Sequence, residues 1–344
     1  MTTEPHLSSR ASEASVGIYP TCNYRPPRGY IPPMLRSTFL YLSEQQQVFA
    51  FVRKNGLARK FARRFVAGET LEEALDAVRS LNAQGITASL DLLGESVRND
   101  AEARQVARDY LHILDRIQER KLDANVSVKL TAMGLDISED LCVANLHDVL
   151  QRARDYRTFV RLDMEGSAYT ERTLRIFEDR LYPSYPEHVG IVLQSYLYRT
   201  KEDTERAIQL RCRVRLCKGA YAEPATVAYP EKADVDKSYM TCMERLLTDG
   251  NYVGLATHDP AIIDHAKRFA TVNNIARDRF EFQMLYGVRR DLQDSLVREG
   301  YKMRVYVPFG TQWYPYLMRR LAERPANVAF ITGNVIREMV GGRK

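Results

Sequence analysis

One short stretch of the chain reads Phe159-Val160-Arg161-Leu162-Asp163-Met164-Glu165. In an extended strand successive side chains point to opposite faces, so the alternation places Arg161, Asp163 and Glu165 on one face and apolar residues on the other. A fully buried strand is normally a continuous apolar run, and charges on one of its faces need an explanation. We therefore expect a strand here whose charged face belongs to a functional site.

Similar short apolar or β-branched runs recur along the chain, which suggests a repeating unit. They lie near residues 87–93, 125–131, 159–164, 189–196, 213–217, 252–256, 280–285 and 303–307. Most are separated by charge-rich amphipathic stretches of helical length, such as 99–121, 138–155 and 232–249. Strands that alternate with helices pair in parallel, because parallel neighbours need a crossover of about a dozen residues or more.

Eight such units predict an α/β fold of the (βα)8 TIM-barrel type. The alternative is an open, doubly wound sheet. The chain contains neither GxGxxG nor GxxxxGK[ST], the phosphate-binding turns that are typical of open nucleotide-binding sheets. The missing turns favour the closed barrel.

The segments before the barrel differ from it in composition. Residues 1–36 are rich in proline and are expected to form a flexible extension. Residues 37–84 are expected to form N-terminal helices, over about 38–66 and 70–83, that pack on the barrel. The second begins with Thr70 as N-cap, before acidic first-turn residues. The barrel, with C-terminal helices, is expected over 85–344.

Composition limits the class of protein. The chain has 344 residues, of which 45% are hydrophobic and 27% charged, as in an ordinary folded protein. It contains no run of about 18 apolar residues and no apolar stretch at its start, so we expect neither a transmembrane helix nor a secretory signal. The net charge is +6, but Lys and Arg are scattered among Asp and Glu, which argues against a nucleic-acid-binding arm.

The cysteines and histidines argue against a metal site. The five cysteines are odd in number and lack CxxC spacing, which indicates reduced thiols in the cytoplasm and no zinc site. Among the six histidines, only His258 follows a predicted strand directly. A metal-dependent barrel hydrolase would need several His or Asp ligands at strand ends.

Polar residues gather where the predicted strands end, which is where TIM barrels carry their active sites. Cations outnumber carboxylates among them, and adjacent arginines such as Arg319 and Arg320 can form forked hydrogen bonds, so a carboxylate or phosphate substrate is favoured. A small-residue turn after the fifth strand, Lys218-Gly219-Ala220-Tyr221, would let backbone N–H groups approach a cofactor. A simpler interpretation of Asp163 is an internal salt bridge to Arg161 or Lys129.

Eight ordered motifs, from about residue 37 to the end of the chain, resemble those of the bacterial monofunctional proline dehydrogenase family. They are Asp91-Leu92-Leu93-Gly94-Glu95, Val128-Lys129-Leu130, Arg161-Leu162-Asp163-Met164-Glu165, Leu193-Gln194-Ser195-Tyr196-Leu197, Arg215-Leu216-Cys217-Lys218-Gly219-Ala220-Tyr221, Ala256-Thr257-His258-Asp259, Phe280-Glu281-Phe282-Gln283-Met284-Leu285-Tyr286-Gly287 and Tyr314-Pro315-Tyr316-Leu317-Met318-Arg319-Arg320-Leu321-Ala322-Glu323-Arg324.

The resemblance implies a distorted (βα)8 barrel that holds FAD, oxidises L-proline to Δ1-pyrroline-5-carboxylate and passes the electrons to a membrane quinone. It implies a cytoplasmic protein, peripheral at the inner face of the membrane. The scattered basic residues, and not the resemblance, lead us to expect no nucleic-acid partner. A pyrroline-5-carboxylate (glutamate-semialdehyde) dehydrogenase would be a further partner.

The resemblance also assigns substrate residues. Arg319, Arg320 and Lys129 match the positions that hold the proline carboxylate. Asp163 matches a catalytic acidic residue that organises the pocket, and Glu95 matches a residue that supports the arginine pair. The wall around the proline ring corresponds to Leu285, Tyr306 and Tyr316.

For the flavin, Arg215 matches a catalytic residue beside N5 of the isoalloxazine ring, and Gln194 matches a hydrogen-bonding partner of the ring. The other matching FAD contacts are Met164, Lys218, Gly219, Ala220, Thr257 and His258. No side chain is assigned as proton acceptor for the proline amine, a role that water can fill.

The sequence departs from the family pattern at Cys217, where aliphatic residues are usual, and residues 310–312 lie in a variable stretch. Two other functions are considered. A flavin-free barrel hydrolase or lyase would use Lys129 and Asp163. Nucleic-acid binding would use the basic charge, but no helix-turn-helix or ribbon segment is evident outside the barrel.

Overall fold

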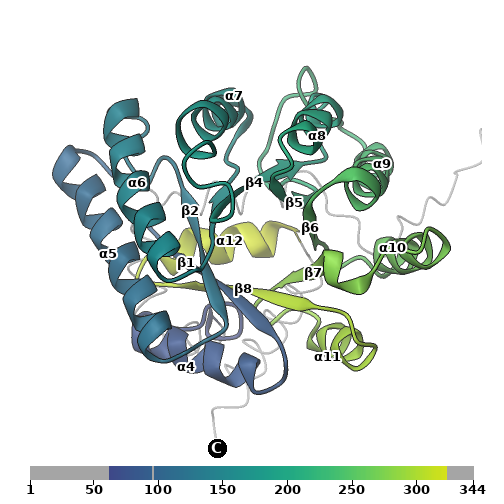
Figure 1. Ribbon diagram of the computed structural model, residues 1–344, viewed down its shortest axis with the longest axis horizontal. Helices are drawn as coiled ribbons and strands as arrows, with labels where there is room; N and C mark the ends of the chain where they lie inside the picture. Colours follow the sequence, from purple (N-terminus) through teal and green to yellow (C-terminus); the bar gives the residue numbers. More distant parts are fainter. Residues whose placement is uncertain (1–61, 95–96, 324–344) are drawn as a thin grey trace, which may run out of the picture.

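The computed structural model describes residues 62–94 and 97–323, with side chains up to residue 318. Its centre is a closed barrel of eight parallel strands in sequential order, with β1 paired to β8 (Figure 1). The strands are β1 Thr87–Leu92, β2 Ala124–Lys129, β3 Val160–Asp163, β4 Val189–Gln194, β5 Arg213–Cys217, β6 Tyr252–Ala256, β7 Phe280–Leu285 and β8 Met303–Phe309. The predicted barrel and all eight predicted strands are confirmed, and the open-sheet alternative is wrong.

Helices connect the strands and form the outer ring in Figure 1. They are α4 Leu71–Asn82, α5 Asp100–Glu119, α6 Glu139–Asp155, α7 Ser167–Arg175 with the π-helical η1 Ile176–Leu181, α8 Thr200–Gln209, α9 Lys232–Asp249, α10 Pro260–Val272, the 3-10 helix η2 Arg277–Arg279, α11 Arg290–Arg298 and α12 Trp313–Glu323. The helices predicted over 70–83, 99–121, 138–155 and 232–249 are confirmed within two residues. The extension predicted over 1–36, and nearly all of the helix predicted over 38–66, lie outside the described residues.

Side-chain caps define where several helices begin. Thr70, Asn99, Ser138 and Asp259 each accept a hydrogen bond from a backbone N–H in the first turn of the helix that follows. These bonds satisfy N–H groups that have no partner within a helix. In α4 the cap is reciprocal, because Glu73 also accepts from the backbone of Thr70.

The strands carry two kinds of side chain on their two faces. Apolar residues such as Leu90, Val128, Leu162 and Leu216 are completely buried in the core shared with the helices. Many of the alternate residues, such as Ser89, Ser127 and Arg215, are polar and buried, and they face the inside of the barrel, where side chains from β5 reach those of β1 and β2. The barrel therefore has an apolar outside and a polar interior.

The last helix does not pack on the side of the barrel. α12 and residues 62–66 form a separate apolar cluster with Leu93, which directly follows β1. Gly310, after β8, donates a backbone hydrogen bond to Gly68. Both segments therefore lie at the carboxyl ends of β1 and β8, and Figure 1 shows α12 inside the outline of the other helices. This placement is the distortion of the regular barrel.

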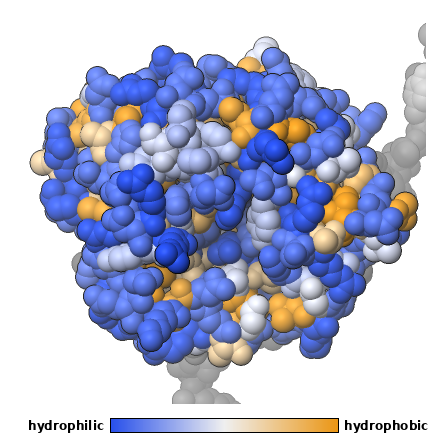
Figure 2. Space-filling model, in the orientation of Figure 1, coloured by the Kyte–Doolittle hydropathy of each residue, from blue (hydrophilic) through white to orange (hydrophobic). Residues whose placement is uncertain are grey.

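The surface is mostly hydrophilic in the view of Figure 2, with apolar residues in small separate groups. Among the described helices, none combines the length and the apolar character that crossing a membrane requires.

We expect Thr70→Ala to lower the free energy of unfolding by about 1 kcal/mol, because the substitution leaves first-turn N–H groups of α4 without their cap. Thr248→Ala is the matched control, since the Thr248 hydroxyl only donates to Glu244 O within α9. Urea unfolding followed by circular dichroism measures both changes. Equal effects of the two substitutions would contradict the capping role.

Candidate active site

A buried ion pair lies at the carboxyl ends of the first two strands. Lys129, the last residue of β2, places Nζ 2.9 Å from Oδ1 of Asp91 on β1, and both side chains are buried. Burial raises the pKa of Asp91, while the Lys129 ammonium acts in the opposite direction. The pair places a cation at the mouth of the barrel where substrates bind in this fold.

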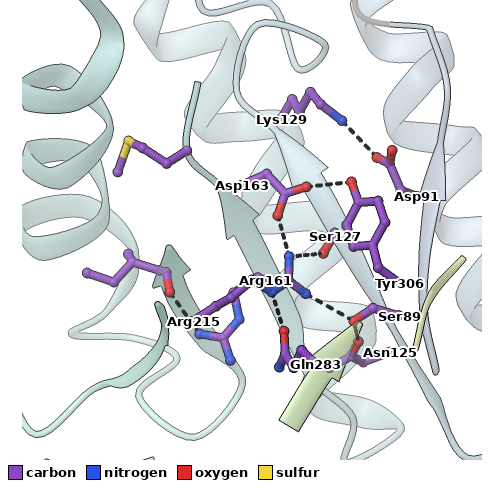
Figure 3. A network of polar contacts seen from close by, with 12 residues as sticks. Ser89, Asp91, Asn125, Ser127, Lys129, Arg161, Asp163, Arg215, Gln283 and Tyr306 are labelled. Atoms are coloured by element: carbon purple, nitrogen blue, oxygen red, sulfur yellow. Dashed lines mark hydrogen bonds and ion pairs between the residues drawn. The ribbon is translucent and has the colours of Figure 1, made fainter. Parts of the chain in front are cut away.

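Arg215 is the centre of the polar interior (Figure 3). Its Nη1 lies 2.7 Å from Oδ1 of Asp163 at the end of β3 and donates to Ser127 of β2 at 3.1 Å. Its Nε donates to Oε1 of Gln283 on β7 at 2.6 Å, and its Nη2 donates to Ser89 of β1 at 3.3 Å. One guanidinium therefore connects five strands of the barrel.

Asp163 is held from a second side as well. The Tyr306 hydroxyl on β8 donates to Oδ2 of Asp163 at 2.8 Å, and the Arg215 guanidinium carbon lies 5.3 Å from the centre of the Tyr306 ring. Burial, followed by the charges of Asp163 and Asp91, raises the pKa of Tyr306 well above its usual value. Tyr306 therefore stays a neutral donor over the physiological pH range, and both oxygens of Asp163 have a fixed partner.

A further set of contacts fixes the orientation of Gln283. Its amide Nε2 donates to Oε1 of Glu281 at 2.6 Å, which leaves Oε1 as the acceptor for Arg215. Glu281 also accepts from Arg304 Nε at 2.7 Å and from the Tyr252 hydroxyl at 3.1 Å. Burial alone would raise the pKa of Glu281, but Arg304 and these hydrogen bonds lower it below its usual value, so the carboxylate stays charged.

The region between β4, β5 and β6 has features that fit a bound cofactor. Gln194 donates to Met164 O at 3.3 Å, and its Oε1 is buried without a hydrogen-bond partner in the described part of the chain. Gly219 follows β5 with φ +112, and a Cβ at this position would lie 2.3 Å from the Tyr196 ring. The buried acceptor of Gln194 is a site at which a polar group of a ligand would gain a hydrogen bond, whereas the glycine turn lets the Tyr196 ring pack against the backbone.

Two other predicted cofactor contacts have defined partners. The Leu285 N–H donates to Nε2 of His258 at 2.9 Å, so the proton of the neutral ring lies on Nδ1. Lys218 Nζ lies 2.6 Å from Asp236 of α9 and 3.0 Å from Asp259 before α10. These ion pairs fix the end of the β5 loop against two helices.

The structure brings most of the predicted site residues to one end of the barrel. Lys129, Asp163, Met164, Gln194 and Leu285 stand at or just after the carboxyl ends of their strands. Lys218, Gly219, Ala220, Thr257 and His258 follow β5 and β6 directly. Arg215 and Tyr306 lie deeper on β5 and β8.

α12 contributes the remaining predicted substrate residues. Tyr316 is buried in the cluster at the mouth, and Arg319 and Arg320 follow it by about one helical turn. The described side chains end before these two arginines, and Glu95 lies outside the described residues. Their roles stay predictions.

Several partners of the site were not predicted from the sequence. Asp91, Ser89, Ser127 and Gln283 contact Lys129 or Arg215, and Asp163 pairs with Arg215 rather than with Arg161 or Lys129. The sequence contains part of the pattern that would have predicted them. Ser89 and Asp91 occupy alternate positions of β1, as Ser127 and Lys129 do on β2, so each pair lies on one face of its strand. Which cation faces Asp163 depends on the closure of the barrel.

Together these groups can bind an anion at the mouth and place a fixed cation beneath it. Lys129 supplies charge near the rim, and Arg215 presents a positive group that cannot rotate away. A preorganised cation of this kind stabilises negative charge that develops during a reaction. The fixed guanidinium is therefore better suited to stabilising such charge than to transferring protons.

Comparison with known proteins agrees with this geometry. A family model described as proline dehydrogenase matches residues 74–333. The chain is 43% identical over 305 residues to proline dehydrogenase 1 of Bacillus subtilis subsp. natto, which covers 89% of this chain and 100% of that protein. It is also 43% identical over 310 residues to the proline dehydrogenase of Deinococcus radiodurans, covering 89% and 99% of the two chains.

Among solved structures, the chain is similar to proline utilization A (PutA) from Bdellovibrio bacteriovorus, with a TM-score of 0.74 and 26% identity. The match covers 84% of this chain and 36% of that longer one. Both the family model and relatives of nearly the same length match most of this sequence, so the chain belongs to the proline dehydrogenase family of enzymes.

Proposed function

We propose that the protein oxidises L-proline to Δ1-pyrroline-5-carboxylate with FAD as cofactor. The observation that carries the proposal is Arg215, a buried cation fixed by Asp163 and Gln283 at the centre of a barrel whose family is proline dehydrogenase. The fit of the cofactor is supported by Oε1 of Gln194, a buried acceptor without a hydrogen-bond partner among the described residues.

The residues of this chain have separate tasks in the proposed reaction. Lys129, together with Arg319 and Arg320 on α12, would bind the carboxylate of proline. Leu285, Tyr306 and Tyr316 would exclude water from its ring. When bound, FAD supplies the oxidant that takes a hydride from C5 of proline, while the amine proton passes to water.

Arg215 would lie beside N5 of the flavin and stabilise the charge gained on reduction. Asp163 and Tyr306 would hold Arg215 in that position. Gln194, Met164, Lys218, Gly219, Ala220, Thr257 and His258 would hold the cofactor through contacts from the ends of β3 to β6. Glu95 would support the arginine pair.

We further propose that a membrane quinone accepts the electrons and that the protein works at the inner face of the membrane. The product is a cyclic imine, which opens in water to an amino aldehyde, so an aldehyde-oxidising dehydrogenase is the expected next enzyme. The bifunctional protein PutA of Escherichia coli supports this link to a second enzyme. This chain is 29% identical to it over 318 residues, which cover 79% of this chain and 24% of PutA.

The first test is the visible spectrum of the purified protein without oxygen. We expect a flavin spectrum that bleaches on addition of L-proline, because the substrate reduces the cofactor. A flavin spectrum that proline leaves unchanged would assign another substrate. A protein that binds no flavin after incubation with FAD would contradict the proposal.

We expect Arg320→Ala to raise the KM for proline at least tenfold, because a charge-assisted hydrogen bond to the carboxylate is worth about 1.5–3 kcal/mol. Arg298→Ala, in the last turn of α11, removes the same charge outside the proposed site and is the control. Steady-state kinetics with a soluble quinone measure both variants. An unchanged KM in Arg320→Ala would remove this residue from the carboxylate site.

We expect Arg215→Lys to slow flavin reduction about 100-fold or more, by analogy with the loss of one preorganised donor in other active sites. Proline binding should change far less, because the carboxylate contacts remain. Anaerobic stopped-flow absorbance separates the reduction rate from the dissociation constant of proline. Equal losses in both quantities would contradict a role of Arg215 beside the reacting atoms.

A further inference from the structure

A second polar cavity lies at the opposite end of the barrel. Its volume is about 430 Å³. It is lined by residues at or just before the amino ends of β2 to β8. Those that matter for its charge are Asn125, Arg157, Arg161, Arg213, Glu281 and Arg304. We call it the lower cavity. It is separate from the proposed active site, which occupies the carboxyl ends of the strands.

Arg161, on β3, is a buried cation in the lower cavity and is only 3% exposed. Its Nη1 donates to the backbone oxygens of Ile191 and Arg213 at 2.9 and 2.7 Å, and its Nε has no hydrogen-bond partner within the described residues. No carboxylate of the described residues forms an ion pair with this guanidinium, although the charge of Glu281 acts on it. Burying a charge without an ion-pair partner costs several kcal/mol of desolvation free energy, so an anion bound beside this cation would offset that cost.

The guanidinium is positively charged despite its burial. Burial, followed by the charge of Arg215, lowers the pKa of Arg161. Glu281 acts in the opposite direction and Arg304 in the same one, and the pKa is about 9, still above neutral pH. Its carbon lies 4.7 Å from the centre of the Phe159 ring, a contact that orients the group without neutralising it.

The absence of a side chain at one position makes room for this cation. A Cβ on Gly190 of β4 would lie 2.7 Å from Nη1 of Arg161 and 2.4 Å from the backbone oxygen of Arg213. Arg161 can therefore lie flat against β4 only because this residue is glycine. The cation is held in a place formed for it by the neighbouring strand.

The rest of the cavity floor favours negative charge. Asn125 is buried. Its Oδ1 accepts a hydrogen bond from Ser89, and its Nδ2 is a hydrogen-bond donor. Glu281 is the buried carboxylate of the floor, and it is engaged by Arg304, Gln283 and Tyr252. The floor therefore offers donors and more positive than negative charge, because Arg161 and Arg304 share the carboxylate of Glu281.

The rim carries charges of both signs. Arg157 is exposed, with φ +53, and Arg213 lies over the Phe159 ring with its guanidinium carbon 5.2 Å from the ring centre. Asp123 and Glu187 are exposed carboxylates, and Glu187 lies 3.8 Å from Arg213. Exposed carboxylates are screened by water, so the buried Arg161 dominates the interior.

We propose that the lower cavity binds a small oxyanion, a carboxylate or phosphate group, against the guanidinium of Arg161 with Asn125 and Arg157 as further donors. A planar guanidinium with free N–H groups matches the paired oxygens of either group. This site is independent of the proposed flavin reaction, since none of these residues belongs to that site.

The test is calorimetric titration of the purified holoprotein with inorganic phosphate and, separately, with glutarate, each at constant ionic strength set by sodium chloride. We expect saturable binding of at least one anion. The tighter of the two identifies the source of the oxyanion group, phosphate or carboxylate.

Two variants locate the site. Arg161→Met removes the buried charge but keeps the aliphatic length, and Arg157→Glu reverses a charge on the rim. Either should weaken binding at least tenfold, in keeping with the loss of a charge-assisted contact. Arg104→Glu, at an exposed position in the first turn of α5, makes the same reversal near the other end of the barrel and should change the affinity less than twofold.

Thermal unfolding provides a second measurement. Phosphate or glutarate should raise the Tm of the unmodified protein more than sodium chloride does, and Arg161→Met should lose this gain. If Arg161→Met fails to fold, Arg157→Glu against Arg104→Glu decides the question. The proposal is overturned if neither anion binds more than chloride, or if Arg157→Glu and Arg104→Glu weaken binding equally.

Discussion

The ion pair between Arg215 and Asp163 is the contact on which the interior of the barrel depends. It joins β5 to β3 at 2.7 Å, and the same guanidinium reaches β1, β2 and β7 through hydrogen bonds. Removing one partner of a buried pair leaves an uncompensated charge and costs about 3–5 kcal/mol. The pair therefore stabilises the closed barrel while it fixes the cation that the proposed reaction uses.

The polar interior separates the barrel into two ends with different chemistry. At the carboxyl ends, Lys129 and Arg215 each have a carboxylate partner that fixes the cation in place. At the amino ends, Arg304 is paired with Glu281, whereas Arg161 contacts backbone oxygens and an aromatic ring and forms no ion pair within the described residues. Carboxylates therefore orient the cations of the proposed active site, and none in the described part of the chain orients Arg161 in this way.

Much of the fold and part of the site could be predicted from the sequence. Short apolar or β-branched runs located every strand, because such runs are a local property of the sequence. Alternation within one of them placed Asp163 on the same face as Arg161 and Glu165. The salt-bridge interpretation of Asp163 named Arg161 or Lys129, whereas the partner is Arg215, which lies on β5 and meets β3 only across the barrel.

By itself the sequence determined the strands, the helices with their caps, and the family to which the motifs belong. These depend on periodicity and on contacts between near neighbours. The tertiary structure alone decided which charges are paired. Ring closure brings β5 opposite β1 and β2, and it places Arg161 beside Gly190, where no carboxylate of the described residues forms an ion pair with it. Which charged side chains pair across a closed barrel depends on the stagger of the strands and on the length of the side chains. A short stretch of sequence does not determine the stagger.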